Sequence, residues 1–411
     1  MPLRPLPAPD SPDAPASVEL QAAERHLLAF KPQLPSTDAL IPYLRQIDQS
    51  RIYSNYGPLV LTLQSRLQDL FGLPANTVVP TGSGTAALMA GILAHAGRPA
   101  PERPLALCPA YTFVATAAAV RQCGYEPYLV DVSPDTWTAN PAALLDHPML
   151  ARVGLVVPVC AYGRAIDIAA WEDFQQRTGV PVVVDAAAAI EAVADGRMHV
   201  SRHLPLALSF HATKAFGCGE GGCLAWADAT LAMRGAQTIN FGFLGSRNSQ
   251  TESLNGKMSE YHAAVALAEL DGWTAKRAAL AGCAAAYRKA FTAAGLPLDT
   301  LITAPDIASN YVLYRLGEQH VPVAGLSAGL ARAGIETRQW YGQGLKGHDI
   351  LRTVAADTLD TSDRLAATLL GLPVACSLSM AQATRVARLL AHEQDAGAPV
   401  TPAASMAHPK A

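Results

Sequence analysis

Apolar runs that alternate with alanine-rich helical segments dominate the middle of this chain. Helices are predicted over segments such as 85–96, 116–123 and 168–178. Seven apolar runs predict β-strands, at residues 77–80, 105–109, 126–132, 154–160, 181–186, 206–210 and 223–226. Runs that are apolar without alternation, such as Val182-Val183-Val184, are typical of strands that helices cover on both faces. The pattern therefore predicts an α/β fold around a mostly parallel, seven-stranded sheet.

The pattern changes after Asn255. A long alanine-rich helix is predicted from Lys257 to about Phe291, and a second group of strands and helices follows from Tyr311 to His392. The proline-rich start and the tail lack apolar periodicity. We therefore expect four parts: a disordered arm (1–30), a large α/β domain (31–255), a smaller α+β C-terminal domain (256–395) and a flexible tail (396–411).

Composition and charge narrow the class of protein. Half of the 411 residues (50%) are hydrophobic, so the chain can bury a large core. The net charge is −3 and no long run of Lys or Arg occurs, which argues against nucleic acid or an anionic membrane as a partner. The seven cysteines lack the paired spacing of a zinc site, so no metal is expected. Small-molecule substrates fit this composition better.

Targeting signals are not evident in the sequence. No apolar region of the kind found in signal peptides follows Arg4. No later apolar run is long enough to span a bilayer. We therefore expect a cytoplasmic protein without a membrane partner.

A polar hexad, Ser209-Phe210-His211-Ala212-Thr213-Lys214, ends one buried strand and precedes a glycine-rich turn. A lysine held between two buried strands is partly desolvated, which lowers its pKa. Its neutral amine can then form a Schiff base with an aldehyde. From the residues alone, a structural role for Lys214 remains an equal alternative.

The segment 80–88 combines a strand end, a glycine turn and a helix start. Its free backbone N–H groups and the hydroxyls of Ser83 and Thr85 point to one place, which suits a phosphate group. A tight connection without a ligand is the alternative.

Asp185 ends the strand 182–184 and is followed by four alanines, 186–189. A lone carboxylate in apolar surroundings needs a cationic partner or loses its charge, and a protonated pyridine nitrogen is one such partner. The alternative is a helix N-cap. Tyr111 and Phe113, which follow the strand 105–109, place aromatic rings at the same sheet edge, although such rings are often simple core.

A phosphate turn, an aromatic ring, a buried carboxylate and a lysine, in this order, are the parts needed to hold pyridoxal 5'-phosphate (PLP). With these motifs the chain resembles the fold type I PLP-dependent aminotransferases and, within them, the DegT/StrS group of nucleotide-sugar aminotransferases. The resemblance runs from about residue 31 to residue 390. It rests on the motifs SNYGPLV (54–60), GSGTAAL (82–88), YTFVAT (111–116), PVCAYG (158–163), SFHATK (209–214), EGG (220–222) and NGKMSE (255–260).

The resemblance implies a role for each of these residues. Lys214 would be the catalytic residue and carry PLP as a Schiff base, Asp185 would pair with the ring nitrogen, and Phe113 or else Tyr111 would stack on the ring. The phosphate would be held by Gly84, Thr85, Ser209 and, from a neighbouring subunit, Asn240. The active unit would then be a homodimer with shared active sites.

The same resemblance implies two half-reactions. An amino-acid donor, most often glutamate, converts PLP to pyridoxamine phosphate (PMP), and a keto nucleotide sugar then accepts the amine. The motifs look most like the branch that aminates C4 of dTDP-4-keto-6-deoxyglucose, a step of deoxyamino-sugar and natural-product biosynthesis. Candidate substrate contacts are Tyr341, Lys257 and His348.

Two departures from the family pattern concern the pocket. Ala188 stands where the family usually has Gln or His near the phenolic oxygen of the cofactor, and the loop 342–348 replaces a usual Pro-Leu-His. We therefore expect a remodelled, more flexible substrate pocket. A non-sugar acceptor, such as a cyclitol or another natural-product scaffold, and non-transamination chemistry on the same fold are the alternatives. A non-catalytic PLP-fold protein would not need Lys214 and Asp185 together.

Overall fold

A computed structural model describes residues 26–317 and 322–397. Its main sheet combines two ladders, in the strand orders β3-β2-β4 and β5-β6-β7-β1. Parallel bridges from Val156 to Val182 and from Val159 to Asp185 join them into one seven-stranded sheet. The strands are β1 (Val78–Thr81), β2 (Leu105–Pro109), β3 (Glu126–Val130), β4 (Val153–Val156), β5 (Val184–Asp185), β6 (Leu206–Ser209) and β7 (Gly222–Ala225). Within this sheet β7 is antiparallel to both neighbours and the other neighbouring strands are parallel, so the predicted fold class is confirmed.

Four strands are shorter than predicted: β3 ends two residues early, β6 ends one residue early, and β4 and β5 differ most. β4 ends at Val156 rather than at residue 160, and β5 covers Val184–Asp185 rather than 181–186. Pro158 and Pro181 accept hydrogen bonds from Asp185 and Val156 across this junction, but a proline has no N–H to donate in return. The ladder between β4 and β5 is therefore reduced to isolated bridges.

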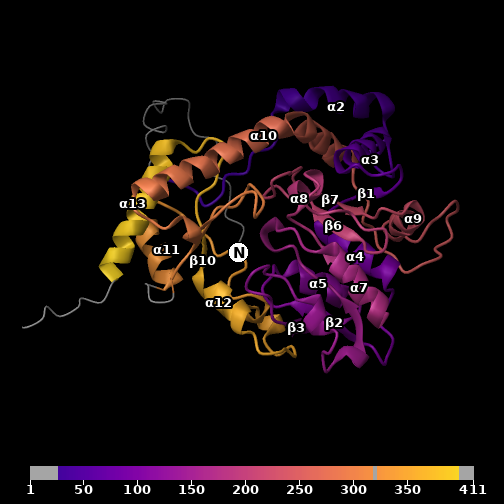
Figure 1. Cartoon of the computed structure of the whole chain (residues 1–411). Helices are drawn as coiled ribbons and strands as arrows, with labels where there is room; N and C mark the ends of the chain where they lie inside the picture. Colours follow the sequence, from indigo (N-terminus) through magenta and orange to yellow (C-terminus); the bar gives the residue numbers. More distant parts are fainter. Residues whose placement is uncertain (1–25, 318–321, 398–411) are drawn as a thin grey trace, which may run out of the picture.

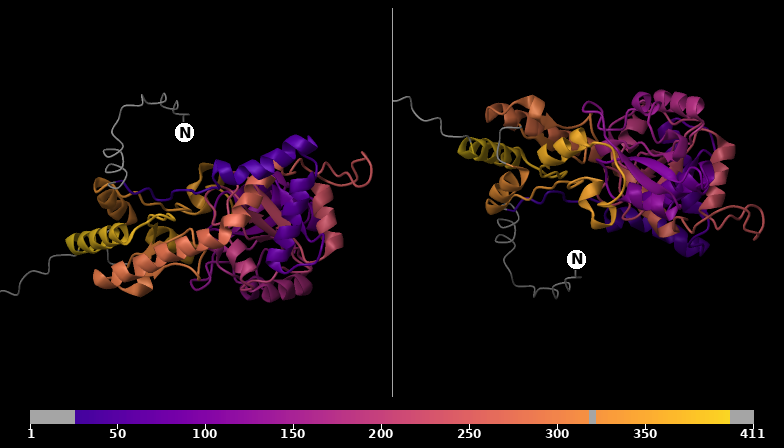
Figure 2. Two further views of the ribbon diagram at one scale, coloured as in Figure 1. Left: turned by 90° about the horizontal axis from the view of Figure 1, so that it is seen from above. Right: turned by 90° about the horizontal axis from the view of Figure 1, so that it is seen from below.

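Helices cover both faces of the main sheet (Figures 1 and 2). Val182 and Val184 belong to the core on one face and Val183 to the core on the other, as expected for a strand buried on both sides. The helices of this part are α2 (Thr37–Ser50), α3 (Pro58–Phe71), α4 (Gly84–His95), α5 (Ala115–Gln122), α6 (Pro141–Leu144), α7 (Ile168–Thr178), α8 (Ile190–Ala194) and α9 (Ala229–Thr238).

A smaller antiparallel sheet, in the order β10-β9-β8, lies in the C-terminal part of the chain (Figure 1). Its strands are β8 (Leu301–Ile302), β9 (Leu313–Arg315) and β10 (Leu369–Gly371), and the helices of this part are α11 (Val323–Arg332), α12 (Asp360–Thr368) and α13 (Met380–Gly397). Figure 2 shows this unit beside the larger one, with the long helix α10 (Glu260–Ala293) running along both.

The predicted long helix is α10, which begins at Glu260 because the Ser259 hydroxyl caps it by accepting a hydrogen bond from the His262 N–H. Trp273 in its first half packs in the core of the larger unit, whereas Tyr287 in its second half packs in that of the smaller one. One helix thus contributes to two cores, and a domain division at residues 255 and 256 remains a proposal.

The structure corrects the end of the predicted arm. Leu27 is buried and forms a bridge with Ile335, and Phe30 forms one with Val374, so the last residues assigned to the arm pack on the smaller unit. Residues 1–25 of the predicted arm and 398–411 of the predicted tail lie outside the described residues. Within the described part, no helix is long and apolar enough to cross a membrane.

Candidate active site

A cavity of about 540 Å³ lies where β5 and β6 end. Parallel strands present their carboxyl ends at one edge of a sheet, so the side chains that follow them converge there. Seven of the predicted site residues line this cavity, namely Gly84, Thr85, Phe113, Asp185, Ser209, Lys214 and Tyr341. They come from segments up to 257 positions apart in the sequence, from 84 to 341, and the fold brings them together.

The start of α4 forms one wall of the cavity. The Ser83 hydroxyl caps this helix by accepting a hydrogen bond from the Ala86 N–H at 3.1 Å. The N–H groups of Gly84 and Thr85 lie in the first helical turn, where an α-helix offers them no partner and where an anion binds favourably. Gly84 touches Ser209, because a Cβ added at position 84 would lie 2.6 Å from the Ser209 Cβ. This cradle fits a phosphate group.

Gly84→Ala tests this close approach. The added methyl group clashes with Ser209 and displaces it, so we expect a loss of about 1–3 kcal/mol in the free energy of unfolding and weaker binding of PLP. Denaturant titration and a PLP binding titration measure the two effects. Gly272→Ala is the matched control, because a Cβ at position 272 in α10 meets no atom within 4 Å. The control is expected to gain about 0.5–1 kcal/mol. Unchanged PLP binding in Gly84→Ala would exclude the cradle.

Asp185 lies at the end of β5 and its side chain is deeply buried. Its Oδ2 accepts a hydrogen bond from the Thr116 hydroxyl at 2.7 Å, and its Oδ1 accepts one from the Ala187 N–H at 3.1 Å. Burial raises the pKa of this carboxyl, while these two hydrogen bonds and the charge of Lys214 lower it in part. Asp185 does not cap a helix, since the nearest one, α8, has Ala189 at its N-cap.

No cation of the described chain lies within salt-bridge distance of Asp185. A buried carboxylate in this position favours a cationic ligand such as a protonated pyridine nitrogen. The hydroxyl pair behind Asp185 was not predicted from the sequence: Thr112 and Thr116 have their hydroxyls 3.1 Å apart, and Thr116 donates to Asp185. Both threonines belong to the motif YTFVAT, in which only the aromatic residues were candidates.

Lys214 lies in the connection between β6 and β7. The backbone of this connection is fixed by hydrogen bonds from the Lys214 N–H to the His211 carbonyl (2.9 Å) and from the Ala212 N–H to the Gly219 carbonyl (2.8 Å). The side chain is half-buried and lines the cavity. A lysine on a fixed loop next to a buried carboxylate is suited to covalent attachment of an aldehyde.

The two aromatic candidates occupy different environments. Phe113 lines the cavity with 57% of its surface exposed, so its ring is available to a ligand. Tyr111 is buried, its hydroxyl lies 3.0 Å from that of Tyr162, and its ring packs edge-on against Tyr341. This geometry favours Phe113 as the stacking residue.

Tyr341 lines the cavity and is tied to its wall. Its hydroxyl accepts a hydrogen bond from the Tyr162 N–H at 3.0 Å, and the two rings stack with centroids 4.5 Å apart. Burial raises the pKa of Tyr341 well above its ordinary value. The hydroxyl therefore stays protonated and connects the smaller unit to the larger one.

Three other predicted residues, Asn240, Lys257 and His348, are not among the residues that line this cavity. The Lys257 Nζ donates a hydrogen bond to the Asn255 side chain at 2.7 Å and lies 4.2 Å from the centre of the Phe241 ring. Asn240 lines a second cavity of about 300 Å³.

The outer wall of the cavity contains residues that the sequence analysis missed. Arg338 is exposed and lines the cavity, its backbone pairs with Gly371, and its guanidinium lies 5.1 Å from the centre of the Trp340 ring. Further lining residues are Thr112, His211, Glu220, Tyr311, Gln339 and Trp340. Arg338, Gln339 and Trp340 directly precede Tyr341, which was the only residue of this run predicted to contact the substrate. An arginine here suits an anionic group of a substrate.

The loop 342–348, which departs from the family pattern, contacts the larger unit. Leu345 is fully buried in the core of the larger unit, and its N–H donates a hydrogen bond to the Ala110 carbonyl at 2.8 Å. Gly344 has a φ of +67° and approaches the same carbonyl closely. The loop is thus docked onto the larger unit. Ala188 lines the cavity, as expected from the sequence.

The sheet order and a cavity of this composition at its strand ends are those of a PLP-dependent transaminase of fold type I. More specifically, residues 36–391 match the DegT/DnrJ/EryC1/StrS aminotransferase family, and the chain belongs to that family. PLP is therefore its cofactor, and nucleotide sugars are the substrates of named relatives.

The chain is 31% identical over 249 residues to dTDP-4-amino-4,6-dideoxy-D-glucose transaminase of Shigella dysenteriae, covering 60% of this chain and 65% of the relative. It is 30% identical over 287 residues to dTDP-3-amino-3,4,6-trideoxy-alpha-D-glucose transaminase of Streptomyces venezuelae, covering 68% and 74%. Among solved structures, that of DesI in the presence of its TDP-sugar product is 29% identical with a TM-score of 0.79, covering 90% of this chain and 93% of DesI.

Proposed function

We propose that this transaminase moves an amino group from L-glutamate to C4 of dTDP-4-keto-6-deoxyglucose. The observation that carries the proposal is the single cavity that contains Lys214, Asp185 and the start of α4. The choice of a 4-keto sugar is supported by the motifs and by the name of the Shigella dysenteriae relative. A place in deoxyamino-sugar biosynthesis for natural products, in the cytoplasm, is part of the same proposal.

Each residue has a role in this proposal. The N–H groups of Gly84 and Thr85 and the hydroxyl of Ser209 hold the phosphate, and Phe113 stacks on the ring. Asp185 keeps the ring nitrogen protonated by its negative charge. When bound, PLP supplies an electron sink for the carbanion that forms when the substrate loses its Cα proton.

Lys214 acts as the proton carrier. With PLP bound, the Nζ of Lys214 would serve as the base that takes the Cα proton of the substrate. The backbone hydrogen bonds of its loop would hold this amine at the cavity. Arg338 on the outer wall supplies a cation for the carboxylate or the diphosphate of the substrates.

The visible spectrum of the PLP-loaded protein tests the proposal. We expect glutamate to remove the absorbance of lysine-bound PLP and dTDP-4-keto-6-deoxyglucose to restore it. If neither glutamate nor another amino acid changes the spectrum, the proposed transamination is wrong. If glutamate acts and 3-keto sugars restore the band in place of the 4-keto sugar, the proposed ketone position is wrong.

A non-sugar acceptor is the second candidate. Ala188 lines the cavity at a position where its methyl group offers no hydrogen bond, so this wall suits a less polar or bulkier acceptor than a standard sugar. Keto-cyclitols in the same spectral experiment distinguish the two candidates.

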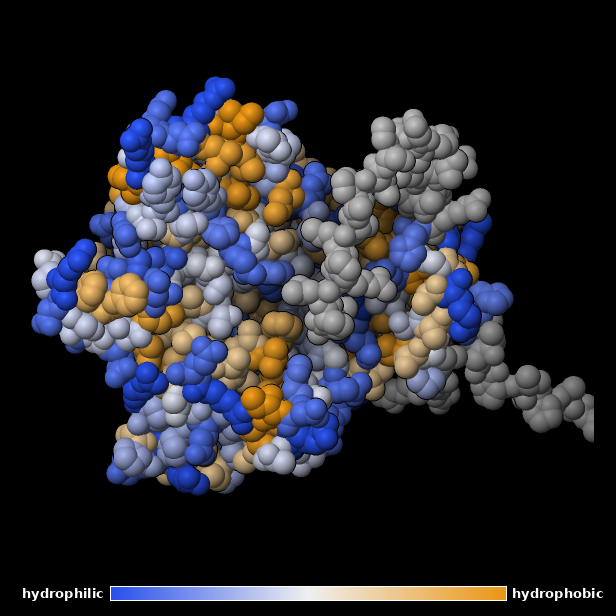
Figure 3. Space-filling view, turned by 180° about the vertical axis from the view of Figure 1, so that it is seen from behind, coloured by the Kyte–Doolittle hydropathy of each residue, from blue (hydrophilic) through white to orange (hydrophobic). Residues whose placement is uncertain are grey.

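We further propose that the active unit is a homodimer with shared active sites. Several large hydrophobic side chains around Asn240 are exposed, and Figure 3 shows hydrophobic residues gathered on the surface of the larger unit. The exposed hydrophobic side chains around Asn240 are Leu61 (52% exposed), Met233 (44%), Phe241 (44%) and Leu244 (47%). Exposed apolar groups in one region are typical of a protein interface.

Mixing two inactive variants tests the shared site. In a dimer of one Lys214→Ala subunit and one Asn240→Ala subunit, one site retains its own Lys214 and the Asn240 of the partner subunit. We expect each homodimer to be impaired and the mixture, after subunit exchange, to recover about a quarter of wild-type turnover. No recovery despite exchange, verified by mass spectrometry, would place Asn240 outside the neighbouring site.

A further inference from the structure

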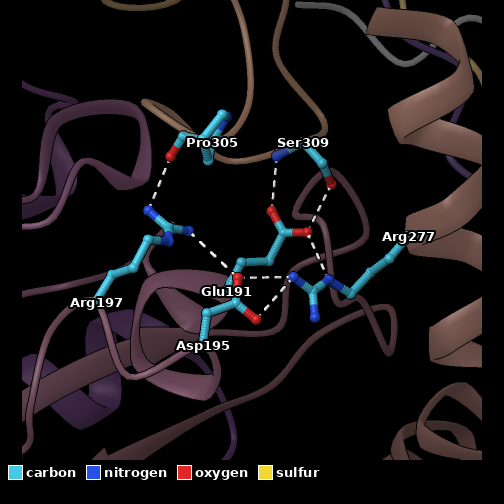
Figure 4. Close-up of polar contacts among 6 residues, drawn as sticks. All are labelled: Glu191, Asp195, Arg197, Arg277, Pro305 and Ser309. Carbon is cyan, nitrogen blue, oxygen red and sulfur yellow. Dashed lines mark hydrogen bonds and ion pairs between the residues drawn. The ribbon is translucent and has the colours of Figure 1, made fainter. Parts of the chain in front are cut away.

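A buried carboxylate that the proposed chemistry does not use lies outside the cavity. Glu191, in α8, is 4% exposed. It accepts hydrogen bonds from the Ser309 N–H (2.6 Å) and the Ser309 hydroxyl (2.8 Å), and from the Arg277 Nε at 3.2 Å. Figure 4 shows Glu191 between the Ser309 segment and Arg277 of α10. A buried carboxylate with three donors is held firmly in one position.

Two arginines and a second carboxylate complete an ion network around the negative charge of Glu191. Arg277 donates two hydrogen bonds to Asp195, at 2.7 and 2.9 Å. Arg197 lies 3.6 Å from Asp195 and donates to the Pro305 carbonyl at 2.8 Å (Figure 4). Two carboxylates and two guanidinium groups thus join α8, α10 and the segment 305–309. Asp195 is about one-third exposed, so its pairing is weaker than that of Glu191.

The next residue in the chain reaches the catalytic loop. Asn310 is 1% exposed, and its Nδ2 donates a hydrogen bond to the Thr213 carbonyl at 2.8 Å. Thr213 directly precedes Lys214. Tyr311, one residue further, lines the cavity. The contacts therefore run without a gap from Glu191 through Ser309 and Asn310 to the loop that holds Lys214.

Asn310 is not placed for stability alone. Its Oδ1 is buried and has no hydrogen-bond partner among the described residues. A buried unpaired acceptor costs stability, so an asparagine that makes one bond here is a costly way to fill a core position. The bond to the Thr213 carbonyl is the benefit that the structure displays.

We propose that Glu191 is a positioning residue for transamination: by holding Ser309, it keeps Asn310 on the Thr213 carbonyl and so fixes the loop that carries Lys214. The inference rests on the proposed role of Lys214. It predicts that loss of the Glu191 charge slows the proton transfers that need a well-placed Nζ, while the affinity for substrate changes little, because Glu191 does not touch the cavity.

Glu191→Gln, with Asp195→Asn as the matched control, tests the proposal in the PLP-loaded enzyme. We expect kcat of Glu191→Gln to fall on the order of 10- to 100-fold, with the KM for glutamate within about threefold of wild type. Asp195→Asn is expected to keep kcat within about twofold, since Ser309 and Asn310 retain their partners. Equal effects of the two variants would overturn the proposal.

A double-mutant cycle with Asn310→Ala shows whether the two residues act through one path. If they do, Glu191→Gln combined with Asn310→Ala lowers kcat no further than Asn310→Ala alone. Losses that multiply would show that Glu191 acts independently of Asn310. Asn310→Ala leaves the ion network of Glu191, Arg277, Asp195 and Arg197 intact. It can therefore be measured by itself if Glu191→Gln fails to fold.

Hydrogen exchange of the protein supplies a readout besides activity. In Glu191→Gln we expect faster exchange confined to the segments 209–219 and 305–313, and Asp195→Asn should lack the effect in 209–219. Normal protection of 209–219 in Glu191→Gln contradicts the proposal. Failure of this inference can be told apart from failure of the proposed function. An active Lys214→Ala variant overturns the proposed function. An inactive Lys214→Ala variant together with a normal Glu191→Gln variant overturns this inference alone.

Discussion

Replacement of Lys214 by alanine is expected to lower turnover by about 10⁴-fold or more. In the proposed mechanism the variant loses both the amine that attaches PLP and the group that carries the proton, and proton transfer by a positioned side chain alone contributes about 10²–10⁴-fold. The fold should survive, because the side chain is half-buried at the edge of a cavity rather than in the core. Single-turnover kinetics with glutamate and a thermal melt measure the two parts of this expectation.

Lys289→Ala is the matched control for this variant. Lys289 is an exposed lysine of α10 and takes no part in the cavity, so the same change of residue there should leave kcat within about twofold. Turnover at an ordinary rate in Lys214→Ala would remove this lysine from the centre of the mechanism. A variant that is inactive but melts far below wild type would instead give Lys214 a structural role.

The parts of the fold that the sequence predicted well are those fixed by local patterns. β2 has the predicted bounds, 105–109, because its apolar run lies between a proline-rich turn that ends at Pro104 and a second proline, Pro109. The lengths of β4 and β5 were not predictable from hydrophobicity, since Pro158 and Pro181 limit their pairing only when the two strands become neighbours.

The candidate site likewise contains residues that the sequence predicted and contacts that it did not. Asp185 ends β5, and Gly84 and Lys214 lie in the segments that follow β1 and β6, so the topology of the sheet brings them together without knowledge of side-chain packing. The supporting contacts join residues distant in sequence: Thr116 and Asp185 are 69 positions apart, and Glu191 and Ser309 are 118 apart. Such pairs depend on how helices and the smaller unit dock, which no local pattern records.

Asp185→Asn is expected to raise the stability of the PLP-free protein and to lower the turnover of the PLP-loaded enzyme. Burial raises the pKa of this carboxyl, so in the PLP-free protein its ionised form is unfavourable. A raised folded-state pKa gives a stability contribution that is present below the unfolded pKa of about 4 and is lost as the pH rises through the folded-state value. The PLP-free Asn variant should therefore gain about 1–3 kcal/mol over wild type at pH 8 and little at pH 4.

With PLP bound, the same substitution should be harmful, because it lowers turnover. The amide Oδ1 can still accept the hydrogen bond from the Ala187 N–H, and its Nδ2 faces the Thr116 hydroxyl as a donor, but the amide carries no charge to hold a proton on the ring nitrogen. We expect turnover to fall by about 10²–10³-fold, as when a preorganised electrostatic group is removed. Asp173→Asn, an exposed carboxylate of α7, should alter neither quantity. A stability gain that is independent of pH would exclude burial of the charge as its cause, and normal turnover would exclude Asp185 from the ring nitrogen.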